Sequence, residues 1–288
     1  MPISLLLAHA GRLGHSPWSF HLHPDVTAVM AALAVGYVIA SRRYAPAAGV
    51  QPSPRERWCF WSSLIVLWVF SEWPIHDLAE GPSYAVHMVQ HLVLTFIVPP
   101  LMLLGVPSWM ARALLRPVLP ILRFLVRPLV AILLFNGFVV LTHWPLMVTA
   151  AIESGSAHLA QHVLLVVGAL IVFWPVLSPL PELPRLSPLF AMVFVFVQSL
   201  IPTIPASWLT FADHPPYHAY EPFPKLWGLT AGEDQQLAGG IMKVGGAFIL
   251  WAYIVAIFYR WAVAEGAGRS PHRPSRTAED VEAAAPVS

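Results

Sequence analysis

Two short motifs of the form His-x-x-Gln-His hold the residues best suited to chemistry. They are His87-Met88-Val89-Gln90-His91 and His158-Leu159-Ala160-Gln161-His162. Residues four apart in an α-helix share one face, about 6 Å apart, so the two imidazoles of each motif can point at one metal ion. Gln90 and Gln161 lie beside them, where each can hold a ring or a bound water. We interpret both motifs as paired metal ligands on helices.

The other donor types narrow the metal chemistry. Zinc proteases use the same histidine spacing, but their general-base glutamate would stand at Met88 or Leu159, so a protease is not expected. Cys59 is the single cysteine, which excludes a CxxC site and leaves imidazole, carboxylate and thioether as ligands. Met88 and Met242 are the thioethers whose depth suits them as supporting soft ligands for cuprous ion.

The surroundings of the two motifs repeat. Trp73-Pro74 precedes the first motif and Trp144-Pro145 precedes the second, and both the tryptophans and the leading histidines are 71 residues apart. We therefore predict a direct repeat of a helical hairpin, about 58–104 and 127–177. The repeat would place both histidine pairs at equal depth, facing each other across a bundle.

Composition identifies the elements that must position these residues. The 288 residues are 57% hydrophobic and 11% charged, and the mean hydropathy is +0.65. This predicts an all-α polytopic membrane bundle of about seven transmembrane helices. The expected spans are about 25–41, 58–76, 84–104, 127–147, 157–177, 188–210 and 236–262. The formal charge of +1 and the scattered arginines exclude a nucleic-acid partner and leave the lipid bilayer as the surroundings.

Arginine placement sets the expected orientation. Arginines cluster between spans one and two, between three and four, and after five and seven, whereas the other loops carry mainly acidic residues. Because cytoplasmic loops retain positive charge, the N-terminus is predicted outside and the C-terminus in the cytoplasm. The expected parts are a periplasmic segment 1–24, a membrane domain 25–262 and a disordered cytoplasmic tail 263–288.

With that topology, all but one of the 13 histidines fall on the outer side, His272 being the exception. Neutral imidazole has no preference for either leaflet, so the asymmetry indicates a site. His76 and His143, at the ends of spans two and four, are candidate further ligands. His214 and His218 in the last outer loop, and the N-terminal histidines, are supporting candidates.

Lys243 is an unusual residue for its position. It falls inside the seventh expected span, where a lysine needs a partner or a wet cavity. Asp234 or Glu233 can pair with it. Alternatively, its ammonium snorkels to the outer interface.

Several motifs together resemble a known family. They are His87-Met-Val-Gln-His-Leu-Val-Leu, Pro99-Pro100-Leu-Met-Leu-Leu-Gly105-Val-Pro107, His143-Trp144-Pro145 and Asp234-Gln235-Gln236-Leu-Ala-Gly239. In order and spacing they resemble the CtaG family of membrane cytochrome c oxidase assembly factors. The resemblance implies a seven-helix protein that helps to mature the copper-containing catalytic subunit of haem-copper oxidases. It also implies that the four motif histidines and Asp234 are functional.

We therefore expect a non-enzymatic protein of the bacterial inner membrane that binds Cu⁺ or Cu²⁺ through periplasm-facing histidines. Its expected partner is the oxidase catalytic subunit, and a periplasmic copper chaperone is left open. Two alternatives remain. One is a membrane oxidoreductase with haem or two metal ions, with zinc also open as the metal. The other is a copper transporter.

Overall fold

The computed structural model describes residues 18, 20, 22–183 and 185–266. Over these residues the chain is all-helical and contains no strand, as the composition predicts. His9, His15, His21 and His272 lie outside the described residues. The last helix continues to Gly266, beyond the predicted start of the tail at 263, and the remainder of the tail also lies outside the described residues.

The elements follow one another with short connections. In chain order they are α2 (Pro24–Ala48), α3 (Pro54–Ser71), α4 (Ile75–Ala79), α5 (Tyr84–Phe96), α6 (Val98–Gly105), α7 (Ser108–Leu115), the 3-10 helix η1 (Arg116–Val118), α8 (Leu119–Leu125), α9 (Pro128–Thr142), α10 (Pro145–Glu153), α11 (Gly155–Leu177), α12 (Pro188–Leu200), α13 (Thr203–Thr210), the 3-10 helices η2 (His218–Tyr220) and η3 (Leu226–Gly228), α14 (Ala231–Gly240), the π-helix η4 (Ile241–Gly245) and α15 (Gly246–Gly266).

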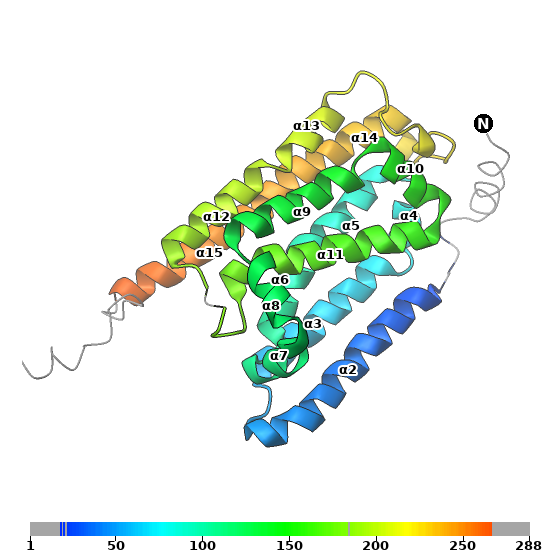
Figure 1. The fold of residues 1–288 in the computed structure, drawn as a ribbon. Helices are drawn as coiled ribbons and strands as arrows, with labels where there is room; N and C mark the ends of the chain where they lie inside the picture. The colour runs from blue at the N-terminus through cyan, green and yellow to red at the C-terminus, as the bar shows by residue number, and fades with distance from the viewer. Residues whose placement is uncertain (1–17, 19, 21, 184, 267–288) are drawn as a thin grey trace, which may run out of the picture.

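Helix α5 lies in the middle of the bundle (Figure 1). It contacts α3 and α4 on one side, α11 on another, and α14, η4 and α15 on a third. Along the far side, α12 packs against α15 and α13 packs against α14. Helix α2 stands at the opposite edge, in contact with α3 and α7. The central helix therefore carries the first histidine motif into the interior of the molecule.

Among the described residues, five stretches are long and apolar enough to cross a membrane. They are Pro24–Ala45, Tyr84–Gly105, Gly155–Leu177, Pro188–Thr210 and Ala231–Gly266. A sixth arises only if Ser108–Leu125 and Pro128–Thr142, which meet at 91°, are taken as one span. The chain is thus a multi-pass membrane protein, but the expected count of about seven is not confirmed. The orientation of the termini stays a prediction.

Two of the expected spans differ from the observed helices, one because of its charged residues and the other because of its length. The expected span 58–76 corresponds to α3, which ends at Ser71 and carries Arg55, Glu56 and Arg57 in its first turn. The expected span 127–147 is interrupted, because α9 has 15 residues and ends before His143. Fifteen helical residues rise only about 22 Å, which is short of a hydrocarbon core of about 30 Å.

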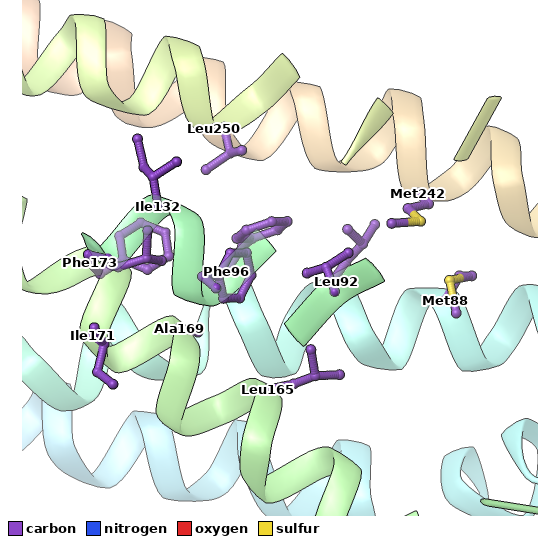
Figure 2. Packing of buried hydrophobic residues seen from close by; sticks show 14 of the residues in the cluster. Met88, Leu92, Phe96, Ile132, Leu165, Ala169, Ile171, Phe173, Met242 and Leu250 are labelled. Carbon is purple, nitrogen blue, oxygen red and sulfur yellow. The ribbon is translucent and has the colours of Figure 1, made fainter. Parts of the chain in front are cut away.

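Side chains on the central helix build the core. Leu92 and Phe96 of α5 lie in one apolar cluster with Leu165 of α11, Ile132 of α9 and Leu250 of α15 (Figure 2). Leu92 and Phe96 follow His91 along the helix, so the histidine motif lies at the end of a packed apolar core.

The helices that carry the motifs begin alike. The side chain of Ser83 accepts a hydrogen bond from Val86 N at the start of α5. The side chain of Ser154 accepts one from Ala157 N at the start of α11. Serine caps of this kind satisfy backbone N–H groups that lack a helical partner. In both cases the first histidine of the motif follows the serine by four residues, so the two motifs lie at the same helical position.

Candidate metal centre

The two histidine motifs meet between α5 and α11. His91 Nε2 lies 3.2 Å from His162 Nε2, and His158 Nε2 lies 3.0 Å from the same His162 atom. Within the first motif, the rings of His87 and His91 have centroids 4.1 Å apart. The structure therefore brings all four imidazoles together, as the repeat predicts.

These separations suit a shared ion. Two nitrogen ligands bound at about 2.0 Å to one tetrahedral ion lie about 3.3 Å apart. The ligand nitrogens of His87, His158 and His162 all lie within 4.8 Å of one another. This histidine triad is a group of side chains that can hold a metal ion.

Two ring nitrogens in the centre have no hydrogen-bond partner among the described residues. They are His87 Nδ1 and His143 Nε2, and both histidines are buried. A buried polar atom left without a partner costs about 1–3 kcal/mol, so such atoms need an explanation. An ion bound to the imidazoles supplies one.

A second group of possible ligands shares His158. Glu80 Oε1 lies 2.6 Å from His158 Nδ1 and 3.2 Å from His76 Nε2, and the ligand atoms of these three residues also lie within 4.8 Å of one another. Sequence reasoning missed Glu80 as a site residue. The signal was present, because His76 and Glu80 are four residues apart and so share a helical face.

The charge of Glu80 fits this position. Burial opposes ionisation of its carboxyl, but hydrogen bonds from His158 and His76 outweigh it and hold the pKa of Glu80 well below its usual range. An ionised carboxylate on one imidazole nitrogen fixes the tautomer of the ring and leaves the other nitrogen free for a metal. Glu80 can therefore orient His158, whose Nε2 faces His162.

The two motif glutamines have different surroundings. Gln90 is buried and its amide nitrogen lies 3.3 Å from His76 Nδ1, so it holds a ring as expected, although the ring comes from α4. Gln161 donates instead to the backbone oxygen of Met147, at 2.8 Å. Of the two predicted roles, holding a ring matches a contact of Gln90, and for Gln161 the holding of a bound water stays a prediction.

His23 extends the polar cluster toward the start of α2. Its Nδ1 lies 3.2 Å from Glu72 and its Nε2 lies 3.2 Å from Asp77. The pKa of His23 is raised to about 9, mainly by the hydrogen bond to Asp77. Partial burial opposes this rise, and the hydrogen bond to Glu72 adds to it. Its ring also contacts His76, with centroids 4.5 Å apart. This N-terminal histidine lies beside the centre.

Asp234 and Lys243 do not form a pair, which was one of the possibilities that the sequence leaves open. Asp234 accepts hydrogen bonds from Ser83 Oγ, at 2.6 Å, and Tyr84 N, at 2.7 Å, so its carboxylate caps α5. The ammonium of Lys243 lies 3.5 Å from Ser207 Oγ and 5.8 Å from the Phe211 ring. The carboxylate of Asp234 is already bound to backbone and hydroxyl donors, which explains why it does not pair with Lys243. The alternative, that the ammonium snorkels to the outer interface, stays a prediction.

The remaining supporting candidates divide by burial. His214 is exposed, and so is His218, which pairs with Glu221 at 2.9 Å. Neither belongs to the two groups of possible ligands among the described residues. Met88 and Met242 are buried and line a cavity together with His91 and His143.

An apolar cleft leads to the centre from the side. It has a volume of about 420 Å³ and lies between α2 and α11, where it is lined by residues such as Val29, Leu33, Val163 and Val167. Its other lining residues include His76, Glu80, His158 and His162. The cleft therefore connects an apolar surface between α2 and α11 with residues of the centre.

One family matches most of the chain. The family described as cytochrome c oxidase caa3 assembly factor (Caa3_CtaG) matches residues 35–264, which include every residue of the centre except His23. No curated protein and no solved structure matches the sequence.

Proposed function

Because the chain belongs to the family of cytochrome c oxidase caa3 assembly factors, we propose that it binds copper and delivers it to the catalytic subunit of a haem-copper oxidase. Copper is the cargo here and not a resident cofactor. The observation that carries the proposal is the convergence of four imidazoles from two His-x-x-Gln-His motifs. His162 Nε2 lies 3.2 Å from His91 Nε2 and 3.0 Å from His158 Nε2, and the His87 ring lies 4.1 Å from that of His91, centroid to centroid.

The ligand set suits a carrier. Imidazole and carboxylate bind copper less strongly than thiolate does. A carrier with thiolate ligands would release its copper slowly. Cys59, the only cysteine, lies on α3 and does not belong to either group of ligands. Reversible binding is what delivery to a second protein requires.

Haem as the bound group has less support. The cavity enclosed by Glu80, His87, His91 and His158 has a volume of about 20 Å³, whereas cofactor-sized ligands occupy pockets of about 300–1,000 Å³. A volume of about 20 Å³ is enough for a single ion. The cleft beside α2 is larger, but most of the residues that line it are apolar.

The site is proposed to face the periplasm of a bacterial inner membrane. The support is the arginine pattern, which assigns the loops next to the histidines to the outer side. A periplasmic copper chaperone is a natural donor for a site in that position.

Metal analysis of the purified protein tests the proposal. The variant has alanine at His87, His91, His158 and His162, and the matched control has alanine at the exposed His214 and His218. We expect the wild type and the control to retain copper after dialysis and the four-histidine variant to lose it. In cells that carry the variant, the oxidase should contain less copper and have lower activity.

Equal copper content in the wild type and the four-histidine variant would remove the proposal. An intense Soret band in the purified wild type would favour the haem alternative instead. Circular dichroism of the variant establishes that the helices remain, so that copper loss is not a consequence of unfolding.

A further inference from the structure

A second cavity lies further along α5 from the first. It has a volume of about 40 Å³, and its wall includes Met88, His91, His143 and Met242. His91 and His143 also line the cavity that holds Glu80 and His158. These two histidines therefore separate the imidazole and carboxylate ligands from a neighbouring space that contains thioethers. A space of about 10–15 Å³ already holds a water molecule, so an ion can be accommodated.

His143 has a nitrogen available in this wall. Its Nδ1 lies 2.7 Å from Val139 O, and a carbonyl oxygen only accepts, so Nδ1 carries the proton in the neutral ring. Nε2 then has a free lone pair, and it is buried without a partner among the described residues. The hydroxyl of Tyr217 donates to the backbone oxygen of His143 at 2.8 Å and fixes its position. Metal-binding histidines show this arrangement, with one nitrogen held by a carbonyl group.

Two thioethers line the same cavity as His143. Met88 and Met242 have exposed fractions of only 1% and 8%, and both side chains lie between α5 and the C-terminal helix (Figure 2). Met242 belongs to the π-helix η4, an irregular turn that is frequent at functional sites. Buried methionine is usually packing. Here two of them line a cavity that is also lined by His143, the histidine whose Nε2 has no partner among the described residues.

Charge favours a monovalent ion in this cavity. None of the described residues that line it is acidic, and Lys243 is among them. The Lys243 ammonium is held on the α13 side by Ser207. A nearby cation repels a divalent ion twice as strongly as a monovalent one. Thioether and imidazole donors without a carboxylate also suit the softer cuprous ion.

We propose that Met88, Met242 and His143, with His91 shared between the two cavities, form a second metal site that binds Cu(I). The inference rests on the proposed function, because copper would reach this space past the histidine cluster. The first site offers nitrogen and oxygen ligands, and the second offers nitrogen ligands and the softer sulfur ligands. One chain would then hold two neighbouring metal sites that differ in the softness of their ligands.

X-ray absorption at the copper edge tests the second site. The purified protein is loaded with cuprous ion without oxygen, and the wild type is compared with the double variant Met88→Leu and Met242→Leu. Leucine keeps the volume and apolar character of methionine, so the fold should tolerate it. The control is Met192→Leu on α12, which does not line the cavity.

In the wild type and the control, we expect the copper spectrum to show scattering from sulfur ligands. In the double variant we expect this sulfur scattering to disappear and the protein to bind one fewer equivalent of Cu(I). The double variant should still bind Cu(II) at the histidine cluster, which shows that it is folded. Cuprous ion bound without sulfur ligands in the wild type, or unchanged sulfur scattering in the double variant, would overturn the second site and leave the proposed function standing. Failure of the wild type to bind any copper would overturn both.

Discussion

His158 joins the two groups of possible ligands through its two ring nitrogens. Nδ1 lies 2.6 Å from Glu80 and Nε2 lies 3.0 Å from His162. The two nitrogens point in different directions, so one ion can use only one of them. With Glu80 on Nδ1, the ring offers Nε2 to the histidine triad, and the carboxylate increases the basicity of that nitrogen.

Glu80→Gln tests this positioning role. Glutamine keeps the size of the side chain but removes the negative charge that orients and polarises His158. We expect copper affinity to fall about 10- to 100-fold, as is typical when a residue that orients a ligand is lost. Titration with copper in the presence of a competing chelator measures the change.

Glu153→Gln is the matched control, because Glu153 is an exposed glutamate at the end of α10. It should bind copper like the wild type. Equal affinity of the Glu80 and Glu153 variants would mean that Glu80 does not act on the site.

At the scale of the element, the capping carboxylate of Asp234 sets the position of α5. Asp234→Asn replaces charge-assisted hydrogen bonds to Ser83 Oγ and Tyr84 N with weaker neutral ones. We expect the variant to lose about 1.5–3 kcal/mol of stability, seen as a lower midpoint of thermal unfolding in detergent. Copper affinity should also fall, since α5 carries His87 and His91. Glu233→Gln, in the exposed capping box of α14, should cost less.

Two adjacent glycines test the packing of α14 on α13. A Cβ at Gly239 would lie 2.5 Å from Thr210 Oγ1 and 2.7 Å from Thr210 N, whereas one at Gly240 would meet nothing within 4 Å. Gly239→Ala should therefore destabilise the protein by about 1–3 kcal/mol, because backbone must move. Gly240→Ala should stabilise it by up to about 1 kcal/mol, because alanine is the better helix former. Similar unfolding midpoints for both variants would contradict the close contact.

The helices were more predictable than the contacts between them. The four-residue spacing of His87 and His91 and the 71-residue repeat predict that two histidine pairs share one depth, and the structure brings them together. Glu80 was missed because its contact with His158 joins residues 78 positions apart in the chain. Pairing of Lys243 with Asp234, one of the interpretations that the sequence leaves open, does not occur because Asp234 caps α5, a contact between segments 150 residues apart.

At the scale of the whole molecule, the incomplete packing of α2 exposes one side of the centre. Helix α2 contacts α3 and α7, and the apolar cleft of about 420 Å³ separates it from α11. Sequence hydropathy predicts that α2 spans the membrane but not which neighbours it lacks. Because the mainly apolar lining of the cleft includes His158 and His162, a partner inside the bilayer can reach the cluster through it.

Site-directed photo-crosslinking tests whether the oxidase catalytic subunit uses this cleft. In a Cys59→Ser background, single cysteines replace Leu33 and Val163, which line the cleft, or Val140 on α9, which is exposed elsewhere. Each cysteine is labelled with a maleimide that carries a photoreactive group, and the membranes are irradiated. The catalytic subunit should be captured from positions 33 and 163 and not from 140, because delivery from the cluster requires the partner to lie where the cleft opens. Capture from position 140 alone would place the partner on the opposite side and exclude lateral transfer through the cleft.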